Sequence, residues 1–361
     1  MLMDEAQRLT ARMAVPPGSL GLLEKQVQRL FRAWPKIEWE LRPHHFVFAA
    51  DNGIVAAGVV GQDQDITYLQ ARNMVEGRAA ISCFCQVQGM PLSVVDVGIK
   101  SEEAVGIDRK VAKGTENFLE SPAMSERNFW RAYDAGAEMV KLAAKDGCNL
   151  LSFGEMGIGN TTTSAAVLHA LTGADLESIT GCGANPGHPE IVLRKREVIA
   201  AATQRYRPLM KTPQDILRCV GGFDLAALCG AMLACKEARI PFLLDGFITA
   251  VALACAAKID PDVTRMAIPT HLSQEPGTAA ALRAGSINPD EVPIHAEMCL
   301  GEGTGAVLGY ALLRTMLYTV RHMKTMEELV RVSQAERPQS RGKYQKQTSV
   351  SRIGACFCGI I

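Results

Sequence analysis

Two glycine-rich runs in this chain each carry a glutamate, and the residues around them suit phosphate binding and proton transfer. The first run, at 154–164, reads GEMGIGNTTTS and lies between an apolar segment and a helix-like stretch. A strand, a glycine-rich turn and a helix in this order present backbone N–H groups and the positive end of a helix to an anion. Glycines let the anion approach the backbone, while Asn and Thr cap the helix and donate hydrogen bonds. The run therefore predicts a phosphate site, with the carboxylate of Glu155 unusually close to it.

The first run matches neither of the common nucleotide motifs. No lysine completes a Walker A loop, and the glycine spacing is not that of a dinucleotide turn. We therefore expect a ligand with a phosphate and a second part that is polar or cationic.

The second run, GEGTG at 301–305, also opens a helix-like stretch. A glutamate between two glycines has no neighbouring side chain to crowd it, so the chain can turn tightly and aim Glu302 into a cleft. An isolated run of this kind indicates only a helix entry with an acidic residue favoured by the helix dipole. Because the chain has two such runs, Glu155 and Glu302 could serve as a general base with an orienting partner, or as a glycosidase-like acid and base pair.

Three other polar residues have structural interpretations by default. His271 stands at a strand end and is interpreted as a hydrogen-bonded structural residue. Lys195 lies between two arginines on a predicted helix, which is typical of a solvated face. Asp245 is predicted to cap the helix that follows it.

The elements that must position these residues alternate along the chain. Five apolar segments predict buried strands, each ending in a polar or glycine cluster, at 46–50, 92–97, 150–153, 241–244 and 266–268. Helices are predicted between them, at 68–88, 126–146, 188–205, 222–237 and 246–257. This alternation predicts an α/β fold, with a parallel sheet covered by helices on both faces. Because ligands bind beyond the carboxyl ends of such strands, all five clusters are expected on one side of the molecule.

The two ends of the chain lack strands. A rigid turn, PPGSLG at 16–21, precedes a helical pattern, and helix-like sequence returns at 306–317. We expect residues 1–40 and 306–333 to pair into a small helical domain beside an α/β domain at 41–305. Residues 334–361 are polar and basic without periodicity, which is typical of a disordered tail.

Composition argues against several classes of partner. The 361 residues include 38 basic and 38 acidic side chains, so no basic field attracts nucleic acid or a membrane surface. No apolar run reaches the roughly 18 residues of a membrane span, and the N-terminus lacks the pattern of a signal peptide. The eleven cysteines lie mostly in apolar stretches and lack zinc-ligand spacing, which favours free thiols in a reducing compartment. We expect a cytoplasmic protein that uses no metal and no cofactor.

Eight motifs, taken in order, resemble those of the nicotinate-nucleotide–dimethylbenzimidazole phosphoribosyltransferase family, from about residue 16 to residue 317. They are PPGSLG (16–21), ADNGI (50–54), VVDVG (94–98), GEMGIGNTT (154–162), GGFD (221–224), DGFI (245–248), HLSQEPG (271–277) and LGEGTGA (300–306). Each motif alone is weak, but their order and spacing together are specific.

The resemblance implies a Rossmann-like sheet, a small domain built from both chain ends, and a homodimer. It implies transfer of the 5-phosphoribosyl group from β-nicotinate mononucleotide to 5,6-dimethylbenzimidazole or a related base, with inversion at C1′. The products would be α-ribazole 5′-phosphate and nicotinate, and Glu302 would be the general base. Phosphate- and nucleotide-binding residues would be Gly157, Gly159, Asn160, Thr161, Thr162, Lys195, Gly301 and Gly303. Glu155 and Met156 would contact the base.

The chain departs from the family pattern at several positions. Val15 replaces a common lysine, and Asp224 replaces the glutamate that usually follows Gly-Gly-Phe. Leu69 is interpreted as the replacement of the family's base-contacting glutamine. The segments at 60–64 and 179–184 also differ, which leaves the accepted base open among dimethylbenzimidazole, another benzimidazole, adenine and a phenolic compound.

Two competing functions come from other classes. A non-catalytic nucleotide-binding or sensor protein on the same fold would need the phosphate turn but no second glycine-flanked carboxylate. An oxidoreductase would need a dinucleotide turn followed by an acidic partner for the ribose, and the sequence has neither in the right order.

Overall fold

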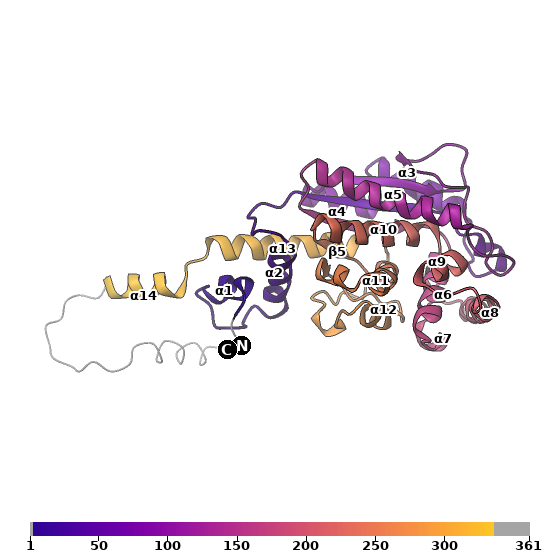
Figure 1. Ribbon diagram of the computed structural model, residues 1–361. Helices are drawn as coiled ribbons and strands as arrows, with labels where there is room; N and C mark the ends of the chain where they lie inside the picture. The colour runs from indigo at the N-terminus through magenta and orange to yellow at the C-terminus, as the bar shows by residue number, and fades with distance from the viewer. Residues whose placement is uncertain (1–2, 336–361) are drawn as a thin grey trace.

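A six-stranded parallel sheet forms the centre of the computed structural model, which describes residues 3–335 (Figure 1). The strand order is β3-β2-β1-β4-β5-β6. The strands are β1 (Pro43–Ala50), β2 (Leu92–Gly98), β3 (Ile107–Asp108), β4 (Leu150–Met156), β5 (Phe242–Leu244) and β6 (Ala267–Pro269). The predicted α/β fold is confirmed, and all five predicted strands are present within a few residues of their expected bounds. The edge strand β3 was not predicted, because two residues are too few to give an apolar run.

Side chains alternate between the two faces of the sheet, as the pleat of a strand requires. From β1, Phe46 and Phe48 enter one hydrophobic cluster, while Val47 and Ala49 enter the other. The strand can therefore be apolar throughout, because helices cover both faces.

The helices divide between the two faces. The Phe46 face packs against α5 (Glu126–Lys145), α6 (Asn160–Thr172), α8 (Pro189–Tyr206), α9 (Pro213–Val220), α10 (Phe223–Ala238), α11 (Phe247–Ile259) and α12 (Thr278–Ala284). The Val47 face packs against α1 (Glu5–Ala11), α2 (Gly21–Ala33), α3 (Asp65–Val75), α4 (Ala80–Gln88) and α13 (Thr304–His322). The remaining helices are α7 (Leu176–Ile179), α14 (Met326–Ala335) and the 3₁₀ turns η1 (Gly53–Ala57), η2 (Pro261–Arg265) and η3 (Pro289–Glu291). Between residues 3 and 335, no helix is long and apolar enough to cross a membrane.

One predicted helix is wrong. The stretch at 68–88 forms two helices, α3 and α4, separated by four residues. Gly77 lies in this break with φ +78°. A residue in the left-handed region ends an α-helix, and glycine adopts that region without a steric penalty. The break matters for the site, because it exposes the N-terminus of α4.

The two chain ends meet in space. Met13 pairs with Thr325 in an isolated antiparallel bridge, and the Ala14 N–H donates to the carbonyl of Lys324 over 3.0 Å. In Figure 1, α1, α2 and α14 lie at one end of the molecule, and α13 runs from there to the sheet. The division into a small helical domain (1–40 with 306–333) and an α/β domain (41–305) stays a prediction. The predicted tail lies outside the described residues from 336 onward.

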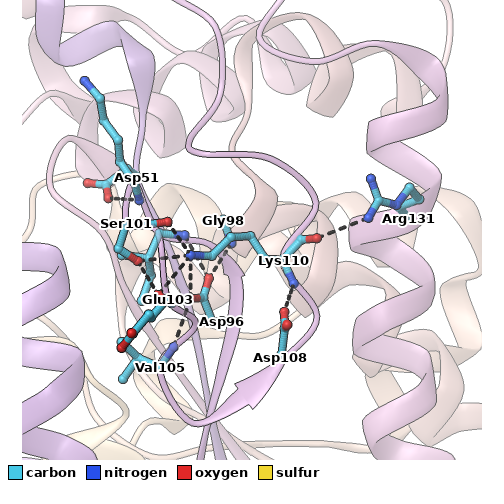
Figure 2. Close-up of polar contacts among 11 residues, drawn as sticks. Asp51, Asp96, Gly98, Ser101, Glu103, Val105, Asp108, Lys110 and Arg131 are labelled. Carbon is cyan, nitrogen blue, oxygen red and sulfur yellow. Dashed lines mark hydrogen bonds and ion pairs between the residues drawn. The ribbon is translucent and has the colours of Figure 1, made fainter.

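A buried ion pair fixes the loop that follows β2 (Figure 2). The fully buried carboxylate of Asp96 accepts hydrogen bonds from the backbone N–H groups of Gly98, Ile99 and Val105, over 2.9–3.1 Å. The Lys110 ammonium lies 3.3 Å from Asp96 Oδ2 and donates to the Ser101 carbonyl over 2.8 Å. Because these contacts satisfy both charges, the loop at 99–110 is held against the carboxyl end of β2.

Candidate active site

A cavity of about 630 Å³ lies beyond the carboxyl ends of β4, β5 and β6. Eight of the residues predicted for the site line it: Glu155, Met156, Gly157, Gly159, Asn160, Thr161, Gly301 and Glu302. Thr162, Lys195 and Gly303 do not line it. The structure thus brings the two glycine-rich runs, far apart in sequence, onto the walls of one cavity.

The GEG turn has an unusual backbone. Gly301, Glu302 and Gly303 have φ values of +82°, +60° and +85°, so three consecutive residues are left-handed. Glycine tolerates this region, whereas the glutamate is held there at a cost of about 1–3 kcal/mol. The turn reverses the chain directly before α13, and this conformation places the Glu302 side chain on the cavity wall.

Two donors hold the carboxylate of Glu302, which is only 4% exposed. Gln70 Nε2 donates to Oε1 over 2.7 Å, and the backbone N–H of Ile81 donates to Oε2 over 3.2 Å. Ile81 lies in the first turn of α4, which is the helix N-terminus that the break at Gly77 exposes. The positive end of a helix and an amide therefore orient the carboxylate.

Leu69, interpreted as the replacement of the family's base-contacting glutamine, does not line the cavity. Leu69 is 56% exposed, while the next residue, Gln70, lines the cavity and contacts Glu302. Adjacent residues on a helix point about 100° apart, so Leu69 faces the surface while Gln70 faces the site.

A neutral histidine supports the GEG turn from behind. His45 is fully buried, and its burial lowers the pKa of the imidazole to about 4. Nε2 lies 3.0 Å from the carbonyl oxygen of Glu302, and Nδ1 lies 2.8 Å from Ser152 Oγ. Because a carbonyl oxygen can only accept, Nε2 carries the proton, and Nδ1 accepts from the serine hydroxyl. The buried core thus fixes the backbone of the turn.

Glu155 differs from Glu302 in its surroundings. Burial, reinforced by the carboxylates of Asp224 and Asp245, raises the pKa of Glu155 to about 8. Its polar partner is Asn160, whose Nδ2 donates to Oε2. Glu155 is therefore largely protonated at neutral pH, so the cavity wall presents a neutral carboxylic acid near Glu302.

The predicted phosphate turn opens α6 into the cavity. Gly159 caps the helix with φ +93°, and Asn160 and Thr161 form its first turn. The Ile158 N–H donates to Thr67 Oγ1 over 3.1 Å, and Asn52 Nδ2 donates to the Ile158 carbonyl over 3.3 Å. These contacts from α3 and the end of β1 fix the turn, so that the helix N-terminus can receive an anion.

Lys195 is not on a solvated face, so that interpretation is wrong. Its side chain is 1% exposed, and Nζ donates to Thr161 Oγ1 over 3.1 Å and to the Gly181 and Cys182 carbonyls over 3.1 and 3.2 Å. Burial lowers the pKa of the ammonium, while the nearby carboxylate of Glu275 opposes this shift. Lys195 thus lies directly behind the first turn of α6 and supplies positive charge there.

Two interpretations near β5 and β6 also change. Asp245 does not cap α11, whose N-cap residue is Gly246; its Oδ1 accepts instead from the Ala306 N–H of α13 over 3.0 Å. His271 Nδ1 lies 3.5 Å from Asp245 Oδ1 and makes no hydrogen bond with the described part of the chain, so a hydrogen-bonded role for that nitrogen is wrong. Asp245 binds α13 because the GEG turn brings that helix beside β5.

Several cavity residues were not predicted, including Gln70, Phe247, Asn185 and Glu275. Phe247 and Glu275 lie in the DGFI and HLSQEPG motifs, so the strand-end position could have identified them. Asn185 and Gln70 come from loop and helix positions without such a signal. Across residues 3–335, no group of three or more His, Cys, Asp or Glu side chains is arranged to hold a metal ion.

Comparison with known proteins identifies the family. A family model described as "Phosphoribosyltransferase" matches residues 1–330. The nicotinate-nucleotide–dimethylbenzimidazole phosphoribosyltransferase of Acetivibrio thermocellus is 36% identical over 332 residues, covering 90% of this chain and 93% of its own length. The protein of the same name from Aromatoleum aromaticum is 35% identical, covering 88% of this chain and 92% of its own length.

Solved structures agree with the sequence comparisons. A crystal structure of CobT from Thermus thermophilus superposes with a TM-score of 0.83 at 36% identity, covering 90% of this chain and 97% of that one. Because sequence and fold both match over most of its length, the chain belongs to the nicotinate-nucleotide–dimethylbenzimidazole phosphoribosyltransferase family.

Proposed function

We propose that the protein transfers the 5-phosphoribosyl group from β-nicotinate mononucleotide to 5,6-dimethylbenzimidazole or a related base, with Glu302 as general base. The observation that carries this proposal is the position of Glu302. Its carboxylate is held by Gln70 and Ile81 on the wall of the cavity into which α6 also opens. One cavity thus offers a proton acceptor and an anion-binding helix end.

The reaction needs little more than these two features. The attacking nitrogen of the base forms a bond to C1′ while the bond from C1′ to the pyridinium nitrogen breaks, and nicotinate leaves with that electron pair. The pyridinium loses its positive charge on leaving, so departure requires neither a general acid nor a metal. Glu302 accepts the N–H proton of the benzimidazole, and attack opposite to nicotinate inverts C1′ and gives the α product. The remaining rate enhancement comes from positioning.

The nucleotide phosphate is proposed to bind at the first turn of α6, against the backbone of Gly157 and Gly159 and the side chains of Asn160 and Thr161. Lys195 contributes its charge through Thr161 rather than from the cavity surface. Thr162 is completely buried, so its contribution comes through the backbone of the helix terminus. Gly301 and Gly303 contribute the backbone conformation of the GEG turn.

Glu155 and Met156 are proposed to contact the base. With a pKa of about 8, Glu155 can donate a hydrogen bond from its protonated carboxyl, while Met156 offers an adaptable apolar wall. Val60 and Gln62 also line the cavity and lie in the segment that departs from the family pattern. These two residues are therefore expected to influence which base is accepted.

We further propose a cytoplasmic homodimer that binds neither nucleic acid nor membranes. The zero net charge supports the proposal that the protein binds neither nucleic acid nor membranes. Size-exclusion chromatography with light scattering distinguishes a dimer from a monomer, and a monomer at catalytic concentrations would contradict the dimer.

Product identification tests the reaction and separates it from the alternatives. The protein is incubated with nicotinate mononucleotide and a panel of bases, and products are identified by mass. Release of nicotinate with formation of a base–ribose phosphate is expected. Nucleotide binding without nicotinate release from any base would favour the non-catalytic binder, and NAD-dependent hydride transfer would favour the oxidoreductase.

A further inference from the structure

A single amide group lies between two buried carboxylates beside the cavity. Asn160 Nδ2 donates to Glu155 Oε2 and, over 3.3 Å, to Asp224 Oδ2. Glu155 and Asn160 line the cavity, whereas Asp224 does not and is completely buried. Asp224 therefore cannot touch a ligand and can act on the site only through its neighbours.

Asp224 is itself rigidly placed. It lies in the first turn of α10, where its Oδ1 accepts from the Leu225 N–H over 2.9 Å. Gly222 lies against both Asp224 and Asn52, because a Cβ on Gly222 would lie 2.3 Å from Asp224 Oδ1 and 2.7 Å from Asn52 Oδ1. Asn52 in turn donates to the carbonyl of Ile158. The Asp224 side chain is thus packed against groups that hold the phosphate turn.

We propose that Asp224 is a positioning residue for nucleotide binding, which acts through the Asn160 amide on Glu155 and on the first turn of α6. The inference rests on the proposed function, because it assumes that the anionic nucleotide binds at this turn. With Asp224 present, the Asn160 amide is held by acceptors on both sides and cannot rotate without losing one of them.

The negative charge of Asp224 also affects the ionisation of Glu155. The Asp224 carboxylate adds to burial in raising the pKa of Glu155, and Asp245 and Glu302 act in the same direction. Removing Asp224 allows Glu155 to ionise at a lower pH. A negative charge then appears on the cavity wall where an anionic nucleotide must bind, so both consequences weaken binding.

A double-mutant cycle tests the inference. The affinity for nicotinate mononucleotide is measured by calorimetry in the wild type, Asp224→Ala, Asn160→Ala and the double variant. Asp224→Ala is expected to weaken binding about tenfold, as loss of a hydrogen bond to a charged group does. Its turnover at saturating nucleotide is expected to fall much less, because Glu302 is untouched. In the Asn160→Ala background, Asp224→Ala is expected to weaken binding clearly less than it does in the wild type, because only the through-space effect of Asp224 on Glu155 remains.

Asp215→Ala is the matched control. Asp215 also lies in the first turn of a helix, α9, but there it forms a capping box with Thr212 outside the cavity lining. It is expected to lower stability without changing nucleotide affinity. If Asp224→Ala does not fold, Asp224→Asn, which keeps the size and the acceptor for Leu225, is expected to weaken binding in the same direction.

Two results would overturn the inference. One is wild-type nucleotide affinity in a folded Asp224 variant, and the other is an equal loss of affinity with and without Asn160. Failure of the wild type itself to bind or turn over the nucleotide is a different outcome, which would instead remove the proposed function.

Discussion

Gly154 of β4 and Glu302 of the GEG turn are in direct backbone contact. A Cβ on Gly154 would lie 2.1 Å from the carbonyl oxygen of Glu302, well inside any allowed contact. The carboxyl end of the strand can approach the turn only because residue 154 has no side chain. This contact joins the two glycine-rich runs, and it fixes the distance between the phosphate turn and the proposed general base.

Gly154→Ala is therefore expected to displace the GEG turn and to lower kcat about a hundredfold, since a shift of about 1 Å in a catalytic group costs that much. Steady-state assays of nicotinate release measure the effect. Gly285→Ala is the matched control, because the atoms nearest to its Cβ would be those of the Leu253 side chain, at 3.2 Å, and the backbone nitrogen of Ala254, at 3.5 Å. Equal activities of the two variants would contradict the proposed role of the contact.

Gln70→Leu removes the side-chain donor to Glu302 while keeping an approximately similar volume. Of the donors to the Glu302 carboxylate at residues 3–335, the Ile81 N–H then remains, and we expect kcat to fall about tenfold, as for loss of a hydrogen bond to a charged group. Gln86→Leu on α4 is the control, because Gln86 donates to the carbonyl of Gly77 and does not line the cavity. An unchanged rate in Gln70→Leu would show that Gln70 does not orient the base.

Glu155 predicts a dependence of stability on pH. Its pKa is about 8 in the folded protein, above the ordinary value of 4.5, so the folded state retains a proton that the unfolded state releases. Protonation of Glu155 therefore contributes fully to the free energy of unfolding below about pH 4.5, and this contribution is lost as the pH rises through about 8. The Tm of the wild type is therefore expected to fall relative to that of Glu155→Gln between about pH 5 and pH 9. Parallel Tm curves over this range would contradict the raised pKa.

Lys110→Met tests the buried ion pair of Figure 2. It leaves the Asp96 carboxylate buried without its cation, and we expect the free energy of unfolding to fall by about 3 kcal/mol. Lys113→Met is the control, because Lys113 pairs with Glu102, whose side chain is 89% exposed, and solvent screens such surface pairs so that they add little to stability. Urea unfolding compares the two, and similar losses would contradict a structural role for the Asp96 pair.

The strands and the long helices could be predicted from the sequence because their signals are local. An apolar run such as 46–50 ends in Asp51, and a parallel sheet then places the strand end on the ligand side. The position of Glu302 on the cavity wall was predictable because the chain has two glycine-rich runs that each carry a glutamate, whereas an isolated run would indicate only a helix entry. The break at Gly77 was harder to predict, because a single glycine within an apolar pattern does not by itself end a helix.

The errors at Lys195 and Asp245 have one physical origin. The environment of each residue is set by a hydrogen-bond partner that is distant in sequence. Flanking arginines favour a solvated Lys195, but the carbonyls of Gly181 and Cys182 bury it. Asp245 precedes α11, yet its Oδ1 accepts from the Ala306 N–H of α13. Local sequence does not encode such long-range partners, so only the folded chain reveals them.

Comparison of Glu302→Gln with the wild type tests the central proposal most directly. Glutamine keeps the size and a carbonyl acceptor but cannot accept the proton of the attacking base. We expect the affinity for nicotinate mononucleotide, measured by calorimetry, to change less than about threefold, and kcat to fall at least about a hundredfold. Wild-type turnover by Glu302→Gln would contradict the assignment of Glu302 as the general base.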